Sequence, residues 1–384
     1  MVKPSRDKPL IHHKDNTKHQ NQQMIVIAGP HYTGAADIQT KLWEWTTFNS
    51  TKQFTQPILD EWVWPIPKPV ANDKFVELEE NKWTPAQVYY PLIEAIKTYI
   101  LRHRVHHNNL KLNHYPQPPS RLVYQKYSLK TIFSMFHDTF QQYWSMGYSL
   151  VLDTEALNHI VKFHELGDDI LHHVSHKLIP SSIPSNQTTV VISYQTPRID
   201  HLLSAWHDIR GVSFHDWIVN GYTGMYSILD ALGMVEKIIF QTNWNVALVD
   251  IKGVQEQSSQ DMPTYIACHI MNSNCNDEGL IGFDREVDKK PITRNPWLRQ
   301  PDIPEGALEE IEKVFLAYDC KYKYLLKHHR SVGRLKVYQS YGMDKMTSFC
   351  DKVDIIPEIK QVKELISNIV KRYHEPSNSI IQTT

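Results

Sequence analysis

Short apolar runs alternate with stretches of helical periodicity along most of the chain, and this alternation predicts the fold. Five of the runs have the length of buried strands. They are Met24–Ala28, Tyr148–Leu152, Thr189–Tyr194, Val246–Asp250 and Tyr265–Cys268. Strands that alternate with helices form a mostly parallel sheet with helices on both faces. We therefore predict an α/β protein with three layers and a central sheet of about five strands.

Helical periodicity is clearest over Tyr127–Met146, where apolar residues form one stripe that we interpret as core packing. The stripe consists of Leu129, Ile132, Phe133, Phe136 and Phe140. The segment Thr84–Gln87 has a capping residue, a proline at the first helical position and a capping-box glutamine, so it predicts a helix that extends to about His103. Further helices are predicted over Asp37–Phe48, Asn158–Leu178, Tyr222–Phe240, Glu305–Leu326 and Pro357–Arg372, and over a segment that carries Ser204 and Trp206.

The length of 384 residues suffices for one large α/β domain or two modest ones. We favour one domain over residues 24–374, because the candidate strands follow one another without a linker-like break. Residues 1–23 and 375–384 are polar and predict a disordered leader and a disordered tail. The stretch Trp62–Pro69 is predicted to be irregular, because prolines at this density exclude a central strand or a helix.

The charge balance, with 41 basic and 42 acidic residues, argues against a general nucleic-acid-binding protein. We find no run of 18 apolar residues, so we expect no transmembrane segment. Cys268 and Cys275 could close a small disulfide loop, but four reduced cysteines are an equally open alternative. The expected compartment is the Golgi or secretory lumen if a leader has been removed, and otherwise the cytoplasm.

Four polar residues fall at steps of four along the predicted helix Asn158–Leu178, which would place them on one face: His164, Asp168, His172 and His176. A metal site needs such spacing. The chain has 21 histidines, however, so we favour a solvated face over a metal site.

The segment Met24–Gln39 has the layout of a phosphate-binding strand, loop and helix. Gly29-Pro30 ends the apolar run, and the small residues that follow would let backbone N–H groups surround an anion at the start of a helix. Glu155 follows the second predicted strand, at the end where α/β sheets bind ligands. It is a candidate catalytic acid or base, or alternatively a first-turn residue that the helix dipole favours.

Two separate segments together resemble the sulfotransferase family, mainly its algal and protist members. Gly29–Gln39 (GPHYTGAADIQ) is similar to the loop that binds the 5′-phosphosulfate, which in the family reads roughly G-P-H-K-T-G-[ST]-[ST]-S-I-Q. Val190–Trp206 is similar to the strand-to-helix segment that binds the 3′-phosphate, where the family has Y-R-x-P-R and then a serine. The resemblance spans about residues 24–300.

This resemblance implies a P-loop-like fold that binds 3′-phosphoadenosine 5′-phosphosulfate (PAPS), without a metal. The sulfuryl group would pass to a hydroxyl or amine of a glycan or small-molecule acceptor, and a protein partner is also left open. The implied co-substrate contacts are His31, Tyr32, Thr33, Gly34, Ala35, Ala36, Arg198 and Ser204. His31 and Glu155 are the implied candidates for moving the acceptor proton.

The chain departs from the family pattern at the phosphate contacts. Tyr32 replaces the lysine, and Ala35 and Ala36 replace two hydroxyl residues. Gln195 replaces the first arginine of the second segment, and Asp37 adds a negative charge. Two hypotheses therefore stand side by side. One is a divergent sulfotransferase, and the other is a pseudoenzyme that keeps the fold as a binding or scaffolding protein.

Overall fold

The structure is a computed structural model in which the chain is described over separate ranges. These are residues 22–29, 35–46, 59, 61–65, 67, 92–93, 95–96, 98–99, 128–153, 169–195, 198–207, 211–221, 230–258, 260–273, 301–328, 333–339 and 341–374. The predicted leader lies outside these ranges up to residue 21, and the predicted tail lies outside them entirely. Gln22 already belongs to the packed protein, because its Nε2 donates to the carbonyl oxygens of Trp144 (2.9 Å) and Tyr148 (3.1 Å).

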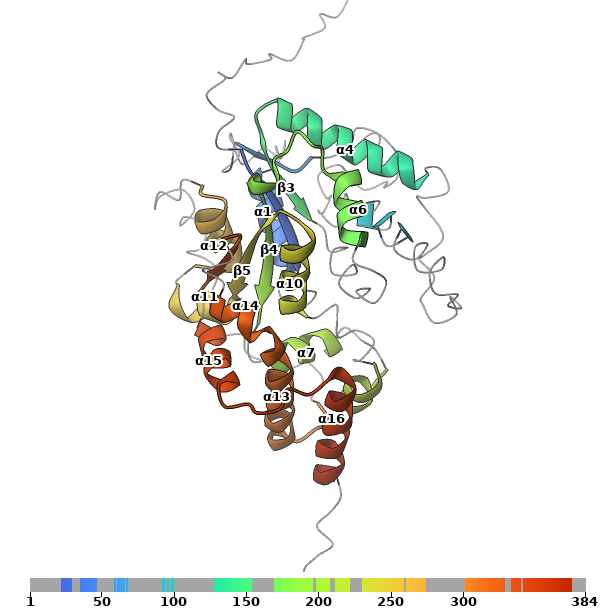
Figure 1. Cartoon of the computed structure of the whole chain (residues 1–384), viewed down its shortest axis with the longest axis vertical. Coiled ribbons are helices and arrows are strands. Elements are labelled where there is room, and N and C mark those ends of the chain that lie inside the picture. The colour runs from blue at the N-terminus through green and yellow to red at the C-terminus, as the bar shows by residue number, and fades with distance from the viewer. Residues whose placement is uncertain are drawn as a thin grey trace, which may run out of the picture.

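One sheet of six strands forms the centre of the molecule, and all its pairings are parallel (Figure 1). The strand order is β2-β3-β1-β4-β5-β6. The bounds are β1 Met24–Gly29, β2 Trp62–Val63, β3 Ser149–Asp153, β4 Thr188–Tyr194, β5 Asn245–Asp250 and β6 Leu335–Tyr338. The predicted α/β class with a parallel sheet is confirmed.

Helices form a layer on each face of this sheet. Helix α6 contacts both α4 and α10, which in turn contact strands β3, β4 and β5, whereas α1, α11, α12 and α15 form a second set that contacts β1 and β5. The α-helices are α1 Ala35–Thr46, α4 Leu129–Ser145, α6 Asp169–Leu178, α7 Arg198–His207, α8 Phe214–Asp216, α10 Ala231–Gln241, α11 Ile251–Gln257, α12 Met262–Tyr265, α13 Glu305–Asp319, α14 Lys323–His328, α15 Tyr341–Cys350 and α16 Ile359–His374. Short 3₁₀ or π segments are η4 Ser185–Gln187, η5 Trp217–Gly221, η6 Ile266–Ile270 and η8 Cys320–Tyr322.

The long helix α4 shows how the local sequence specifies an element. Ser128 caps its N-terminus, since the side chain accepts a hydrogen bond from the backbone N–H of Thr131 at 3.1 Å. The predicted apolar stripe is buried at Ile132, Phe133, Phe136 and Phe140, and Leu129 packs against the same core. The predicted packing role of this stripe is therefore confirmed.

The fifth predicted strand, Tyr265–Cys268, is wrong: these residues are helical in α12 and η6. Asp261 caps this helix by accepting a hydrogen bond from the N–H of Thr264 (2.9 Å), and Pro263 occupies its first turn. A short buried apolar run has no periodicity that separates a strand from a helix, so the cap decides the outcome.

Two strands were not predicted. β6 (Leu335–Tyr338) pairs with β5 at the edge of the sheet and lies after the range in which strands were expected. β2 (Trp62–Val63) lies within the proline-rich stretch and pairs with β3 at the other edge. Prolines are tolerated beside a two-residue edge strand, so the exclusion of a central strand holds.

The predicted helices occur, with shifted ends or with parts outside the described residues. α1 begins two residues before Asp37, α16 covers residues 359–374, and the range Glu305–Leu326 divides into α13, η8 and α14. α15 was not predicted. The cap at Thr84 and the ranges 154–168 and 222–229 lie outside the described residues, although 92–93, 95–96 and 98–99 are helical.

A second apolar cluster lies beyond the carboxyl ends of the strands, toward which the arrow of β4 points (Figure 1). It joins α7, α8, η5, α13 and α16. The buried stripe of α16 comprises Val362, Ile366, Ile369 and Val370. Spacing of this kind is typical of a helix that packs along one face. The C-terminal helices therefore assemble around α7 at the carboxyl edge of the sheet.

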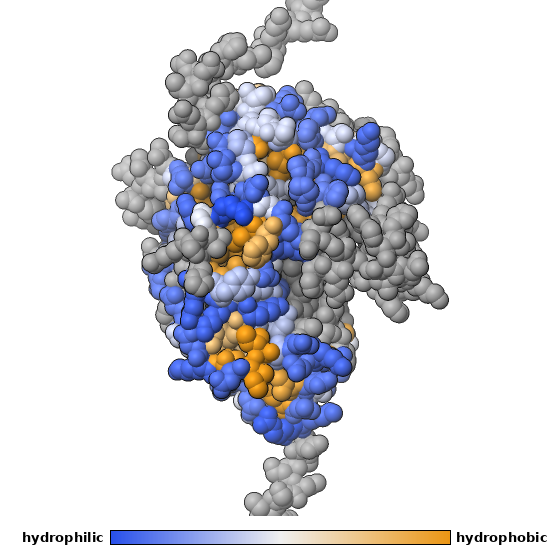
Figure 2. Space-filling view, in the orientation of Figure 1, coloured by the Kyte–Doolittle hydropathy of each residue, from blue (hydrophilic) through white to orange (hydrophobic). Residues whose placement is uncertain are grey.

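The outer surface of these C-terminal helices is partly apolar (Figure 2). Ile355 is 80% exposed, and Leu365 is 43% exposed. Both border an open groove of about 520 Å³ between α13 and α16. In the described ranges, no helix offers an apolar stretch that could span a bilayer.

Disulfides are present, so the alternative of four reduced cysteines is wrong. Cys320 pairs with Cys350, a pairing that we did not predict. Cys268 is also disulfide-bonded, and its expected partner Cys275 lies outside the described residues.

An ion pair between α1 and α12 gives a testable pH dependence. Lys41 forms an ion pair with the carboxylate of Asp261. Burial raises the pKa of Asp261, but the hydrogen bonds from Lys41 and Thr264 and the positive charge of Lys41 lower it more. The pKa of Asp261 therefore lies below its usual value of 3.8. The stabilisation is therefore complete above about pH 4 and is lost as the pH falls through the folded-state pKa.

We expect Asp261→Asn, which keeps a capping side chain, to cost about 0.5–1 kcal/mol at pH 7 because both side chains are partly exposed. It should also flatten the loss of stability below pH 4. Urea unfolding at pH 7 and pH 3 measures both effects. Asp354→Asn is the control, since Asp354 is exposed and forms no ion pair with the described residues. Equal pH dependence in wild type and Asp261→Asn would contradict the prediction.

Candidate functional site

The chain reverses its direction across the sheet between β1 and β4. From β1 it continues to β2 and β3 on one side, and it then crosses to β4, β5 and β6 on the other side. In doubly wound sheets, ligands bind outside the carboxyl ends of the two strands at such a switch point. The carboxyl edge of β1 and β4 is therefore the candidate functional site.

Strand β1 ends at a glycine whose backbone conformation permits a sharp change of chain direction. Gly29 is buried and has φ 99°, a conformation that glycine adopts at little cost. The pairing with β4 shifts register between Ile27 and Gly29. α1 then begins at Ala35, so the predicted Ala35 and Ala36 contacts are its first two residues. His31, Tyr32, Thr33 and Gly34 lie outside the described residues.

The second predicted segment begins at the same edge. Gly29 pairs with Ile192, two residues before the end of β4. Only residues 195–197 separate β4 from α7, which starts at Arg198. The backbone thus brings the end of β1 and the start of α7 to one edge of the sheet, as the two segments require. The side chain of Arg198 lies outside the described part of the structure.

Ser204 lies farther from this edge than Arg198. It is six residues into α7, which corresponds to roughly 9 Å along the helix axis. The side chain is exposed, and its hydroxyl donates to the carbonyl oxygen of Asp200 at 3.0 Å. The Ser204 hydroxyl is therefore bound to its own helix in this structure.

A carboxylate already occupies the N-terminus of α7. The backbone N–H of Ile199 donates to Oε2 of Glu312, on α13, at 2.7 Å. A negative charge is favourable there, because the free N–H groups of a helix N-terminus carry partial positive charge. Glu312 was not among the predicted site residues. The only sequence signal was its place in an acidic helix, which does not reveal a contact with a segment 113 positions away.

Glu155, the predicted proton acceptor, lies two residues after the end of β3 and outside the described residues. Strand β3 itself ends at the candidate edge, because Asp153 pairs with Ile27 of β1. The carboxyl end of β3, after which Glu155 follows in the sequence, therefore lies beside the carboxyl end of β1.

Other acids at this edge serve as helix caps. Asp250 ends β5, is fully buried and accepts a hydrogen bond from the N–H of Gly253 at 3.2 Å. Asp230 caps α10 through the N–H of Gly233 (2.9 Å) and also accepts the hydroxyl of Tyr322 at 2.6 Å. Burial and the neighbouring Asp230 raise the pKa of Tyr322, which keeps the phenol protonated as the donor. These carboxylates are engaged structurally.

The histidine face on α6 is only partly described. His172 and His176 are exposed with their ring centroids 4.2 Å apart, and His164 and Asp168 lie outside the described residues. Within those residues, no group of three or more His, Cys, Asp or Glu side chains has the arrangement of a metal site.

We compared the chain with known protein families, with curated proteins and with solved structures, and found no match in any of the three. The assignment of function therefore depends on the geometry of the carboxyl edge and on the two sequence segments that meet there.

Proposed function

We propose that this chain is a sulfotransferase-like protein that binds PAPS at the carboxyl edge of β1 and β4. One observation carries the proposal: Gly29, which ends β1 with a positive φ, and the start of α7 lie at the same edge of a parallel sheet, at its switch point. The two segments that resemble the family's phosphate-binding segments come from 160 or more positions apart in the sequence. Their convergence is what a single bisphosphorylated nucleotide would need.

In this proposal PAPS supplies the sulfuryl group to a hydroxyl or amine of a glycan or small-molecule acceptor. The acceptor oxygen or nitrogen bonds to sulfur as the sulfur–oxygen bond to the 5′-phosphate breaks, and adenosine 3′,5′-bisphosphate leaves. His31 or Glu155 takes the proton that the acceptor loses. Backbone N–H groups between Gly29 and α1 stabilise the negative charge of the leaving phosphate.

A second candidate function is a pseudoenzyme with the same fold. Tyr32 and Gln195 stand where the family has a lysine and an arginine, and each such loss typically costs about 2.7–4 kcal/mol of transition-state stabilisation. The contact between Glu312 and the N–H of Ile199 favours this alternative specifically. It places a carboxylate where the 3′-phosphate would approach α7, and the two anions would repel each other.

The disulfides support the lumenal alternative for the compartment. Disulfides persist in oxidising compartments such as the secretory pathway and are rare in the cytosol. The pairing of Cys320 with Cys350 and the bonded state of Cys268 therefore favour a Golgi or secretory protein over a cytoplasmic one. A glycan acceptor fits that compartment.

Binding of adenosine 3′,5′-bisphosphate tests the proposal. At 100 times its dissociation constant, the nucleotide should add about 2.7 kcal/mol of stability and raise the thermal midpoint. We expect Arg198→Ala to weaken binding by about 100-fold, because it removes a charged partner of the 3′-phosphate. Lys360→Ala, on the exposed side of α16, is the control and should bind as wild type does. No shift at millimolar nucleotide would overturn the proposal.

Glu312→Gln separates the two candidate functions. It keeps a side-chain oxygen for the N–H of Ile199 and removes the negative charge. If the carboxylate opposes the 3′-phosphate, the variant should bind adenosine 3′,5′-bisphosphate about tenfold more tightly than wild type. Sulfuryl transfer by the wild-type chain supports the enzyme. Nucleotide binding without transfer, strengthened in Glu312→Gln, supports the pseudoenzyme.

A further inference from the structure

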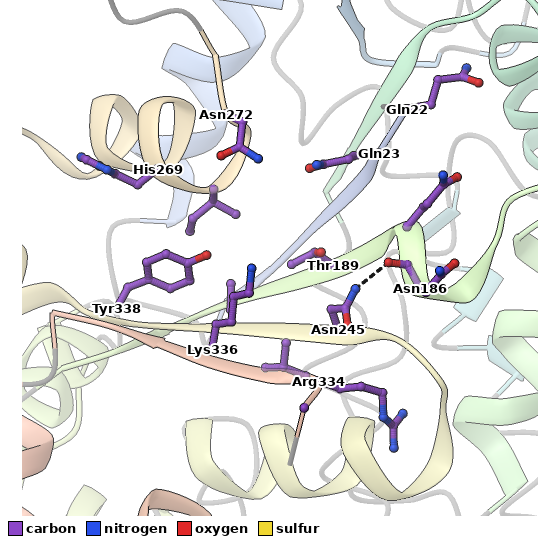
Figure 3. A pocket seen from close by; sticks show the side chains of 15 residues that line it. Gln22, Gln23, Asn186, Thr189, Asn245, His269, Asn272, Arg334, Lys336 and Tyr338 are labelled. Atoms are coloured by element: carbon purple, nitrogen blue, oxygen red, sulfur yellow. Dashed lines mark hydrogen bonds between the residues drawn. The ribbon is translucent and has the colours of Figure 1, made fainter. Parts of the chain in front are cut away.

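A second cavity opens at the opposite, amino edge of the sheet (Figure 3). Its volume is about 330 Å³, at the lower end of the range of roughly 300–1,000 Å³ that is usual for small-molecule sites. Thr189 lines it, whereas Tyr194 ends the same strand at the carboxyl edge. Five residues of a parallel strand span roughly 17 Å, so the cavity is separate from the proposed nucleotide site.

Polar side chains form a row across neighbouring strands at this cavity. Thr189 on β4 pairs with Asn245 on β5, and Lys336 on β6 pairs with Ala247, one pleat farther along β5. Gln23 completes the row immediately before β1. Parallel strands that are covered on both faces normally carry apolar residues at such positions. The row therefore leaves polar groups that need partners from outside the sheet.

The cavity offers a positive charge for which the described residues supply no counter-ion. Its described lining contains no aspartate or glutamate. Lys336 is exposed and forms no ion pair or hydrogen bond with the described residues. Arg334 is already engaged, because its guanidinium points away and donates to the carbonyl oxygens of Ile239 (2.7 Å) and Thr242. The amine of Lys336 is thus the cation that a ligand would meet.

Amide groups surround this amine. In Figure 3 the side chains of Gln23, Asn272 and Lys336 point toward the same space. Asn272 lies two residues after the end of η6 and has φ 51°, and its side chain forms no hydrogen bond with the described residues. Asn245 donates through Nδ2 to the carbonyl oxygen of Asn186 at 2.7 Å, which leaves its own amide oxygen as an acceptor. Amides both donate and accept, so they match hydroxyl groups, which do the same.

We propose that this cavity binds a sugar of monosaccharide size that carries one anionic group, either a carboxylate or a sulfate. The amine of Lys336 pairs with the anion, and the amides of Gln23, Asn245 and Asn272 bind the ring hydroxyls. Charge-assisted hydrogen bonds are about twice as strong as neutral ones, so the anion orients the ring. The volume admits one ring with its substituents and not a long chain.

Ligand-observed NMR and calorimetry on the full chain test this site with four probes. These are glucuronate, N-acetylglucosamine 6-sulfate, methyl glucoside and potassium sulfate. We expect one or both of the anionic sugars to bind, and the one that binds identifies the anion. Methyl glucoside lacks the anionic group, and sulfate lacks the ring hydroxyls. Each should therefore bind at least tenfold more weakly than the anionic sugar that binds.

Two variants assign the binding to the cavity. Lys336→Gln should weaken the binding of the anionic sugar by about tenfold, and Asn272→Gly, which keeps the left-handed backbone, should weaken it several-fold. Lys352→Gln, which changes an exposed lysine in the turn after α15, is the matched control and should change nothing. Adenosine 3′,5′-bisphosphate should not displace the sugar, because the two proposed sites are separate. A negative result for nucleotide binding therefore leaves the sugar proposal standing, and the reverse also holds. The proposal would be overturned if neither anionic sugar bound, or if methyl glucoside or sulfate bound as tightly as the anionic sugar. It would also be overturned if Lys336→Gln and Lys352→Gln had equal effects on binding.

Discussion

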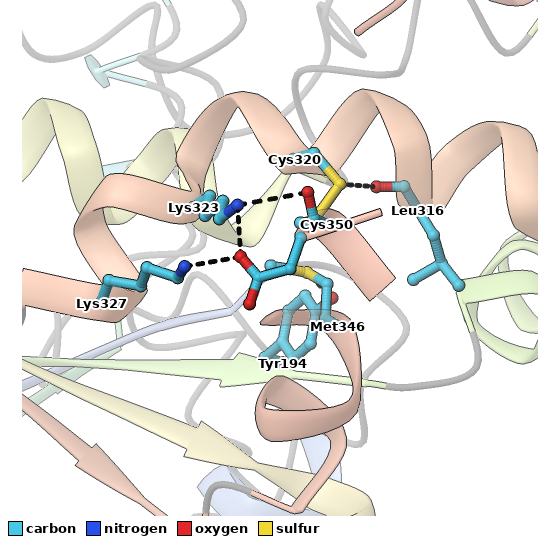
Figure 4. The surroundings of a disulfide bond; sticks show 8 residues. Tyr194, Leu316, Cys320, Lys323, Lys327, Met346 and Cys350 are labelled. Atoms are coloured by element: carbon cyan, nitrogen blue, oxygen red, sulfur yellow. Dashed lines mark hydrogen bonds and ion pairs between the residues drawn. A yellow bond between two sulfur atoms is a disulfide. The ribbon is translucent and has the colours of Figure 1, made fainter. Parts of the chain in front are cut away.

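Replacing Cys320 and Cys350 together by alanine is expected to lower the free energy of unfolding by about 3 kcal/mol. The two residues are 30 positions apart, and their disulfide joins the start of η8 to the end of α15 (Figure 4). Without the bond, the loop between the two residues is no longer closed in the unfolded chain. The unfolded chain then has more conformational entropy, which favours unfolding. In the folded protein the bond holds α15 close to the sheet, where Met346 accepts the hydroxyl of Tyr194 at 3.2 Å.

Urea unfolding of the oxidised proteins measures this loss. The neighbouring ion pairs cannot replace the bond: Asp351 contacts Lys323 (2.5 Å) and Lys327 (2.6 Å), but it is exposed, and such pairs contribute little. Hydrogen bonds from these two lysines lower the pKa of Asp351 to about 2. Asp351→Asn is therefore the matched control and should have a much smaller effect. A double-alanine variant that unfolds at the same urea concentration as wild type would contradict the prediction.

Replacing Gly253 by alanine is expected to destabilise the protein by about 2 kcal/mol. Gly253 is buried in α11, and an added Cβ would lie 2.3 Å from the backbone oxygen of Gln339 and 2.9 Å from its Cβ. Gln339 follows β6 with φ 55°, so its carbonyl belongs to a turn that has little freedom to withdraw. The strain must exceed the advantage of about 1 kcal/mol that alanine has over glycine within a helix.

Gly333→Ala provides the control for this substitution. A Cβ at Gly333 would meet no atom within 4 Å, so this variant should match the wild type closely. Denaturant unfolding measures the free energy of unfolding of both variants. The same substitution is thereby compared at a position in close contact with another backbone segment and at a position next to open space. If Gly253→Ala were as stable as wild type or more so, α11 and the turn after β6 would have to be farther apart than the structure places them.

The central strands and the longest helix could be predicted from local sequence because their signals are local. β1, β3, β4 and β5 are apolar runs bounded by polar or turn residues, and their burial follows from that pattern. Helix α4 has both a cap and a complete apolar stripe. β6 lacked such a signal, because it is a four-residue strand at a sheet edge in which only Leu335 is buried.

The pairing of distant segments could not be predicted in the same way. Tyr265–Cys268 is as apolar as a strand, yet the cap at Asp261 makes it helical and the ion pair with Lys41 holds its start against α1. The pairing of Cys320 with Cys350 could not be predicted, because spacing alone does not tell which cysteines approach each other. Glu312 reaches α7 only because α13 packs beside it.

By itself, the sequence determined the α/β class, the four central strands β1, β3, β4 and β5, and helix α4, and it supplied the two segments on which our proposal of phosphate binding depends. Each of these depends on the hydrophobicity and conformational preference of neighbouring residues. Only the tertiary structure decided that β1 and β4 end side by side, that Glu312 meets the N–H of Ile199, and that Lys336 lies beside amide side chains in a cavity at the opposite edge. These contacts join residues far apart in the chain, and their existence depends on how the whole sheet and its helices pack.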